Sequence, residues 1–193
     1  MTLRDLLIQR AARLQEWPAF TAPGWEPLRW PAFRNRVEGV ALGLMAAAPA
    51  LGSPVFSATG GPWDWACEVA CACCGLVWHP DGAPVPAAVL GGPCFNDEAG
   101  RQPYHDRDHE LTDATLFTGT LDHGEMLRRL QRLNRQLGWD HGAEVTLPLE
   151  RIATPEGRGA LWSALYAGSH AIMAPGKVKD WDPGVFAGLF QIT

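Results

Sequence analysis

The chain has 193 residues, of which 47% are hydrophobic and 19% charged, a balance that excludes a disordered chain and is sufficient for one α/β domain with a core. The net charge of −5 comes without a basic stripe, so we expect no nucleic-acid partner. No apolar run approaches the roughly 20 residues of a membrane span. The N-terminal stretch "MTLRDLLIQRAARLQEW" also lacks the apolar core of a signal peptide. We therefore expect a cytoplasmic protein without a membrane partner, in which residues 1–193 form one domain.

The first half of the chain predicts three helices and two short strands. Apolar residues at helical spacing predict a first helix that begins near Leu3 with Thr2 as its N-cap. Turns and short extended pieces follow in "PAFTAPGWEPLRW", and Pro31 then opens a second helix. The segment "SPVFS" reads as a buried strand, a third helix is expected over Trp63–Cys74 with Gly75 as its end, and "LVWHP" reads as the next strand.

The second half alternates strands and helices. Residues 81–113 contain many helix breakers and are predicted as a long surface excursion. Beyond them we expect three strands, each followed by a helix: Ala114–Phe117, His123–Leu137, Glu144–Leu147, Gly157–Ala167, His170–Met173 and Pro183–Phe190. This alternation predicts an α/β fold with a mainly parallel sheet and helices on both faces.

One stretch in this half, "ATLFTGTLDHGEMLRRL", has the layout of a phosphate-binding loop. It reads as a strand, a turn of small residues and a helix. The turn contains two glycines but no lysine, since the only lysines of the chain are Lys177 and Lys179. Arginine carries most of the positive charge, a usage typical of GC-rich bacterial genomes.

The order of several segments resembles the N-terminal portion of the adenylate-forming (acyl-CoA synthetase, AMP-binding) enzymes. These segments are "IQRAARLQEWPAF", "WEPLRWPAFRNRVEGVALGL", "PVFSATGGPWDWACEVACACCGLVWHP" and "RGALWSALYAGSHAIMAPGKVKDWDPGVFAGLFQIT". The likeness runs through nearly the whole chain but covers only the first part of such enzymes. It implies a truncated relative that ends before the family's adenine-binding stretch, its acidic Mg²⁺/ATP motifs and the C-terminal domain with the catalytic lysine. No residue of this chain is therefore assigned a catalytic role.

The family's phosphate loop, "T-S-G-T-T-G-x-P-K-G", is degenerate here by this resemblance. Thr118, Gly119, Thr120 and Gly124 remain, the loop is shortened and its lysine is gone. Asp122 and Glu125 introduce negative charges where phosphates would lie. A like-charge contact near 4 Å costs roughly 4 kcal/mol at an effective dielectric constant near 20, whereas a helix N-terminus returns about 0.3–1 kcal/mol.

We therefore expect neither ATP nor another cofactor. A structural interpretation explains both acids, because Asp122 suits the N-cap of the helix that begins at His123 and Glu125 lies close to a capping-box position.

Two clusters invite a metal-site interpretation. Cys67, Cys71 and Cys74 recur at i, i+4 and i+7, which favours a core stripe over a zinc site. His105 and His109, in "YHDRDHE", could bind a divalent metal or act as acid and base if they shared a helix face. The alternative is a solvated surface loop that leads into a strand.

Three functions remain open. The first is a non-catalytic acyl-CoA synthetase-like protein, a pseudoenzyme that binds a partner protein or a small acyl or aromatic ligand. The second is one half of a split acyl-CoA synthetase that needs a second chain. The third is a metal-dependent enzyme that uses His105 and His109. Because the resemblance ends within a larger sheet, apolar surface should remain, and we expect self-association or a hetero-partner.

Overall fold

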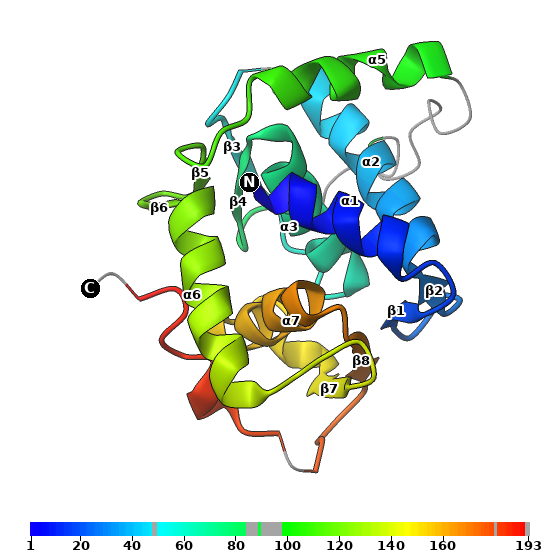
Figure 1. Ribbon diagram of the computed structural model, residues 1–193, viewed down its shortest axis with the longest axis vertical. Coiled ribbons are helices and arrows are strands. Elements are labelled where there is room, and N and C mark those ends of the chain that lie inside the picture. Colours follow the sequence, from blue (N-terminus) through cyan, green and yellow to red (C-terminus); the bar gives the residue numbers. More distant parts are fainter. Residues whose placement is uncertain (48–49, 84–88, 90–97, 180, 192–193) are drawn as a thin grey trace.

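The computed structural model describes residues 1–47, 50–83, 89, 98–179 and 181–191. Figure 1 shows α7 with strands β7 and β8 in the lower part of the molecule, α5 and most of α2 in the upper part, and α1 and α3 at mid-height. The longer helices are α1 (Leu3–Arg13), α2 (Trp30–Ala47), α3 (Pro62–Cys74), α5 (Glu98–Asp106), α6 (His123–Leu137) and α7 (Pro155–Ala167). Short 3₁₀ turns are η2 (Arg107–His109), η3 (Leu149–Arg151) and η4 (Pro183–Val185).

The main sheet has four strands in the order β2-β1-β8-β7, formed by Leu28–Arg29, Pro18–Thr21, His170–Ala174 and Glu144–Pro148 respectively. β8 pairs in parallel with both β1 and β7, and among the described strands of this sheet only β1 and β2 pair antiparallel. Two smaller pairs are β3 (Pro54–Phe56) with β4 (Val77–His79), in parallel, and β5 (Leu116–Thr118) with β6 (Leu121–Asp122), antiparallel. The predicted α/β class with mainly parallel strands is confirmed.

Local sequence signals fix several helix ends as predicted. The hydroxyl of Thr2 accepts a hydrogen bond from the Asp5 N–H (3.2 Å), and the Asp5 carboxylate accepts one from the Thr2 N–H (2.7 Å), which completes a capping box. α3 ends at Gly75, whose φ of 72° lies in the left-handed region that glycine adopts readily. Both ends therefore follow from the residues at the predicted positions.

Strand β3 is present but is not buried as predicted, since Phe56 is 55% exposed. Two other predicted segments differ from the described structure in kind. The excursion over residues 81–113 contains the helix α5 and the turn η2, so "YHDRDHE" is helical and not a loop; residues 84–88 and 90–97 of that prediction lie outside the described part. The last helix, expected over Pro183–Phe190, is only the turn η4. Elsewhere α7 begins two residues earlier than predicted, at Pro155 with Thr154 as its N-cap.

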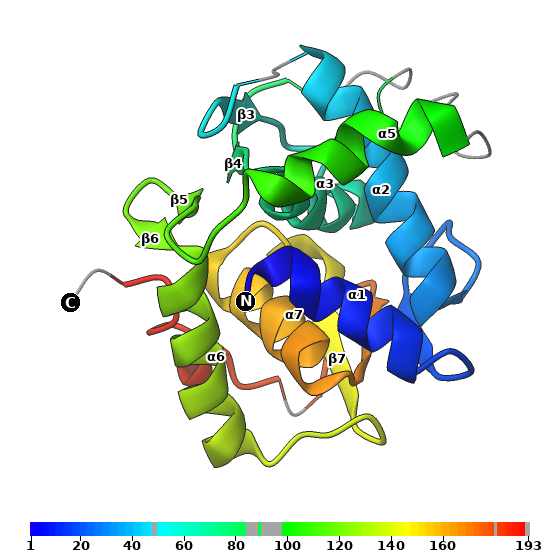
Figure 2. The ribbon, with the colours of Figure 1, turned by 45° about the horizontal axis from the view of Figure 1, so that its top comes forward.

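The core joins the helices to the main sheet. Buried apolar residues of α1, α2, α3, α6, α7, β7 and β8 belong to one cluster. Along β7 and β8 buried residues alternate with more exposed ones, as expected for strands with one face turned to the core. Figure 2 shows α1 beside α7 with the N-terminus near the start of α6. Among the described residues no helix has the length and apolar character needed to cross a membrane.

Candidate functional site

The predicted phosphate loop lies at a tight hairpin. Thr118 of β5 pairs with Leu121 of β6, so that only Gly119 and Thr120 connect the two strands. The expected passage from strand through turn to helix is therefore replaced by strand, turn, strand and then helix. Gly124 lies apart from the turn, in the first turn of α6, where it packs against Asp113.

The first three backbone N–H groups of α6 donate hydrogen bonds to oxygen atoms of the protein. The His123 N–H donates to the Thr115 carbonyl (3.0 Å), and the Gly124 N–H donates to the Asp113 carbonyl (2.8 Å). The Glu125 N–H donates to the Asp122 carboxylate (2.7 Å), which confirms Asp122 as the N-cap. These are the donors that a helix N-terminus offers to an anion. In this protein all three N–H groups already donate to the protein's own oxygens, so an anion would have to displace those acceptors.

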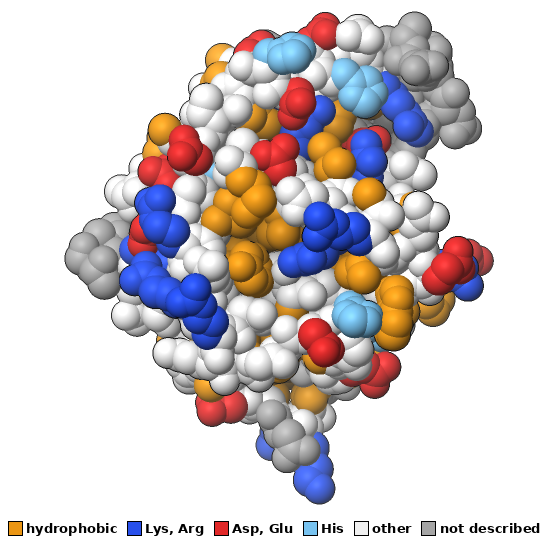
Figure 3. All heavy atoms as spheres, viewed as in Figure 1, with side chains coloured by type: hydrophobic (Ala, Val, Ile, Leu, Met, Phe, Trp, Pro, Cys, Tyr) orange, Lys and Arg blue, Asp and Glu red, His pale blue; other side chains and the backbone are white. Residues whose placement is uncertain are grey.

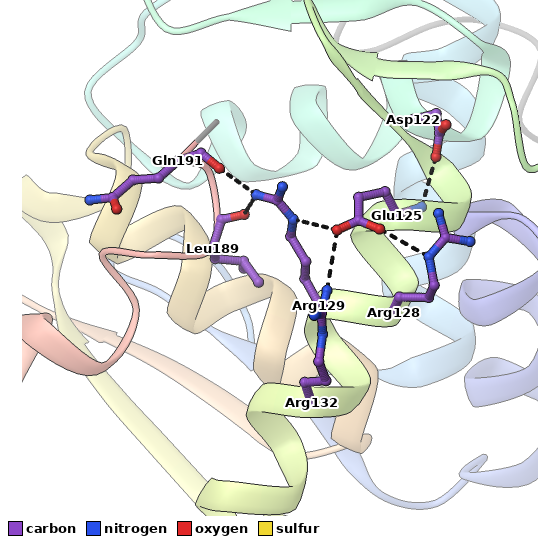
Figure 4. Close-up of polar contacts among 7 residues, drawn as sticks. All are labelled: Asp122, Glu125, Arg128, Arg129, Arg132, Leu189 and Gln191. Atoms are coloured by element: carbon purple, nitrogen blue, oxygen red, sulfur yellow. Dashed lines mark hydrogen bonds and ion pairs between the residues drawn. The ribbon is translucent and has the colours of Figure 1, made fainter. Parts of the chain in front are cut away.

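The side chain of Glu125 turns away from the helix end, so the predicted capping box at this position was wrong. Figure 4 shows its carboxylate among three arginines of the same helix. It accepts from Arg128 Nε (2.9 Å), Arg129 Nε (2.9 Å) and Arg132 Nη2 (3.2 Å). Hydrogen bonds from Arg129 and then Arg128 hold the pKa of Glu125 below its ordinary value, so the carboxylate is charged at neutral pH.

Arg129 also fixes the segment that follows η4. Its Nη1 donates to the carbonyls of Leu189 (3.1 Å) and Gln191 (2.6 Å), as Figure 4 shows.

A hollow of about 360 Å³ lies between this segment and α6. Its lining combines charged and apolar side chains: Glu125, Arg129, Arg132, Leu133, Gln136, Val185 and Leu189. In Figure 3 one group of basic side chains lies along the edge of the molecule over α6.

A buried ion pair lies behind the hairpin. Arg158 of α7 donates through Nε (3.0 Å) and Nη2 (2.7 Å) to the Glu68 carboxylate of α3. Glu68 also accepts from Trp162 Nε1 at 2.9 Å. The Arg158 guanidinium lies 4.4 Å from the ring centroid of Phe190, and Phe190 in turn packs against Phe117 of β5. Sequence reasoning missed this network because its members are 90 residues apart.

No protein-family model and no curated protein matches this sequence. Solved structures do match. The inhibitor-bound N-terminal domain of FACL13 from Mycobacterium tuberculosis is similar with a TM-score of 0.69 at 12% identity, over 92% of this chain and 58% of that one. The N-terminal subdomain of NpsA from Klebsiella oxytoca matches with a TM-score of 0.64 at 15% identity, over 93% of this chain and 55% of that one.

A fatty acyl-adenylate ligase from L. pneumophila, in complex with acyl adenylate and pyrophosphate, matches with a TM-score of 0.64 at 12% identity. There the match covers 90% of this chain and 40% of the ligase. This chain has the fold of the N-terminal portion of adenylate-forming enzymes. It spans 58% or less of each of these three structures, and at such low identity the adenylate-forming likeness is one of fold, as the sequence resemblance predicted.

The two histidines considered as an alternative metal site lie on α5 and η2. His105 is near the end of α5 and His109 is in η2, and both are exposed. The acids between them have partners of their own, since Asp106 accepts from Gln102 (2.6 Å) and Asp108 pairs with Arg4 (3.3 Å). The described part of the chain contains no group of three or more His, Cys, Asp or Glu residues that could bind a metal.

The clustered cysteines are packing residues, as predicted. Cys67, Cys71, Cys73 and Cys74 are buried free thiols of α3. Burial raises the pKa of the Cys67 and Cys73 thiols to about 12 and raises those of Cys71 and Cys74 as well. Thiols that stay protonated in this way are poor nucleophiles and poor metal ligands.

No pattern in the sequence indicated that the side chain of His123 is buried. His123, the first residue of α6, accepts a long hydrogen bond from the Leu3 N–H at Nδ1 (3.4 Å). Its Nε2 has no hydrogen-bond partner among the described residues. Burial lowers the pKa of His123 to about 4, against the smaller opposing effects of Asp122 and Asp5. The ring is therefore neutral at physiological pH and joins α1 to α6 as a packing group.

Proposed function

We propose that this chain is a non-catalytic protein that uses the adenylate-forming fold to bind a partner protein or a small acyl or aromatic ligand. The observation that carries the proposal is the closed start of α6. The N–H groups of His123, Gly124 and Glu125 are bonded to the protein's own oxygens, at 2.7–3.0 Å.

A triphosphate at this position would need N–H donors and a cation. To obtain them it would have to break the Asp122 cap and displace the charged Glu125 from Arg128, Arg129 and Arg132. The turn between β5 and β6 has only Gly119 and Thr120, so its backbone is too short to wrap around phosphate oxygens. Nucleotide binding is therefore disfavoured by hydrogen bonding as well as by charge.

Isothermal titration calorimetry of the chain with Mg·ATP tests this proposal. We expect no saturable binding. The Glu125→Gln variant is the matched control, because it removes the local negative charge and leaves the N–H bonds in place; it should also fail to bind. Saturable binding near one ATP per chain, or acid-dependent ATP–pyrophosphate exchange with fatty or aromatic acids, would overturn the non-catalytic proposal.

The alternative is one half of a split acyl-CoA synthetase. It is favoured by one observation, that the chain spans only 40–58% of the solved structures described above. Native mass spectrometry of the protein isolated from its own cells separates the two. A stoichiometric second chain that restores ATP–pyrophosphate exchange supports the split enzyme, whereas a complex without exchange supports the binding role.

A further inference from the structure

Val185 is an exposed apolar side chain between two hollows. It follows Pro183 in the turn η4 and is 42% exposed. The first hollow is the one of about 360 Å³ against α6, and the second, of about 210 Å³, lies at the N-terminal end of β7. Val185 lines both of them. We call Val185 and the linings of these two hollows the Val185 surface.

The two halves of the Val185 surface carry opposite charges. On the α6 side, Arg129 and Arg132 line the first hollow, and the Arg132 side chain is 67% exposed. On the β7 side, Glu144 and Asp182 line the second hollow, and the Glu144 side chain is 69% exposed. The basic half also includes Glu125, which pairs with Arg129 and Arg132, so the two arginines of this lining exceed its one carboxylate by a single positive charge. The surface thus has a basic half, an apolar centre and an acidic half.

The acidic half also contains a free strand edge. Among the described residues β7 pairs only with β8, and it ends the main sheet. The second hollow lies along Glu144, Val145 and Thr146 of that strand and is bounded by aromatic rings of Trp139, Trp181 and Phe186. Within the described part of the chain, the buried Nε1 of Trp181 has no hydrogen-bond partner. An unpaired strand beside an aromatic hollow is a favourable place for association.

A surface with this arrangement is complementary to itself. Rotation by 180° about an axis near Val185 brings the basic half over the acidic half of a second copy, and the acidic half over its basic half. It also brings the two valines together at the centre. This is the requirement for an isologous interface, in which the same patch serves both subunits. A partner of one charge would satisfy only one half.

We propose that the Val185 surface is an interface between two copies of this chain, related by a twofold axis. The inference deepens the proposed function and rests on it for the view that the chain acts by association. It identifies the partner as a second copy. Arg132 and Glu144 contribute charge pairs at the rim, and Val185 is buried at the centre.

Sedimentation velocity over about a hundredfold range of protein concentration tests the interface. We expect a reversible dimer that Val185→Asp shifts to monomer. Leu51→Asp is the matched control, because Leu51 is 43% exposed and is absent from the linings of both hollows. It should leave the dimer unchanged. A monomer at every concentration, which leaves the surface to a different protein, would overturn the proposal, as would a dimer insensitive to Val185→Asp.

Charge reversal tests the twofold axis itself. Arg132→Glu alone and Glu144→Arg alone each place like charges across the interface and should raise the dimer dissociation constant by about tenfold. An equimolar mixture of the two variants should regain association as a heterodimer, because each reversed charge then faces its opposite. Failure of the mixture to regain association rules out the twofold arrangement. The ATP calorimetry is independent of all these results, so failure of the interface can be told from failure of the non-catalytic proposal.

Discussion

The guanidinium of Arg158 and the carboxylate of Glu68 form a buried two-point ion pair between α7 and α3, with Nε at 3.0 Å from both carboxylate oxygens and Nη2 at 2.7 Å from one. Loss of one partner leaves the other charge buried without compensation, whereas replacement of both by apolar groups is far less costly. We therefore expect the pair to specify how α7 is placed against α3 more than it adds to stability.

Arg158→Met should lower the free energy of unfolding by about 3–5 kcal/mol, because it leaves the Glu68 carboxylate buried without an opposite charge. The measurement is urea unfolding followed by tryptophan fluorescence. The double variant Glu68→Met/Arg158→Met should recover most of the loss. If the single and double variants were equally unstable, packing and not the unpaired charge would be the cause.

Asp122→Ala should lower the free energy of unfolding by about 1 kcal/mol, because it removes the oxygen that accepts from the Glu125 N–H at 2.7 Å. Asp122→Asn keeps an acceptor in place and should remain close to the parent. Thermal unfolding monitored by circular dichroism compares the three proteins. Equal losses for alanine and asparagine would mean that the negative charge, and not the cap, is the stabilising feature.

Protonation of His123 should destabilise the fold in mild acid. Its folded-state pKa is lowered from 6.5 to about 4, so the unfolded chain binds the proton more tightly than the folded one. The stability that this group contributes is fully present above pH 6.5 and is lost as the pH falls toward 4, by about 3 kcal/mol over that interval.

The free energy of unfolding is measured at several pH values between 4 and 6.5 for the parent and for His123→Leu. The measurement gives the change of stability with pH for each protein. The leucine variant is expected to be less sensitive to pH between 6.5 and 4 by about the same amount. Parallel pH profiles for the two proteins would contradict the assignment to His123.

Gly157→Ala should lower the free energy of unfolding by about 1–3 kcal/mol. A Cβ at this position would lie 1.9 Å from the Arg151 carbonyl oxygen, so α7 or η3 has to move. Gly119→Ala is the control, because no heavy atom lies within 4 Å of its Cβ position. Chemical denaturation should show Gly119→Ala within about 0.5 kcal/mol of the parent. Equal effects at both sites would contradict the close approach at Gly157.

The thiols of Cys67, Cys71, Cys73 and Cys74 should resist iodoacetamide in the native protein and react after unfolding. Burial raises their pKa values and keeps them protonated, and reagent has no access to the inner face of α3. Peptide mass spectrometry locates the modified residues. Rapid native-state alkylation of the α3 peptide would mean that the helix opens or that a thiolate is present.

Local signals in the sequence were sufficient for features that depend on near neighbours. Thr2, Gly75 and Asp122 act at helix ends as their residue types predict, and the cysteine stripe of α3 is buried as its spacing predicts. The order of segments also predicted the adenylate-forming fold. Each of these inferences uses residues that lie close together in the chain or a pattern that survives at 12–15% identity.

Features that depend on distant contacts could not be predicted. α5 contains Pro103 and few apolar residues, yet it is held by Arg4, which donates to the Tyr104 carbonyl from 100 residues away. The last predicted helix is only the turn η4, and Phe186 at its end lies against Gly159 of α7, a contact that no local pattern indicated. The Glu68–Arg158 pair likewise had no local signal. Of the candidate site, only the Asp122 cap could be inferred from the residue order.

Arg129 links α6 to the segment that follows η4. Its Nε bonds to Glu125, and its Nη1 bonds to the carbonyls of Leu189 and Gln191. The two contacts use different nitrogens of one guanidinium, so Arg129 is a shared donor to the carboxylate of Glu125 and to the segment after η4. Removal of this single side chain would release both contacts at once.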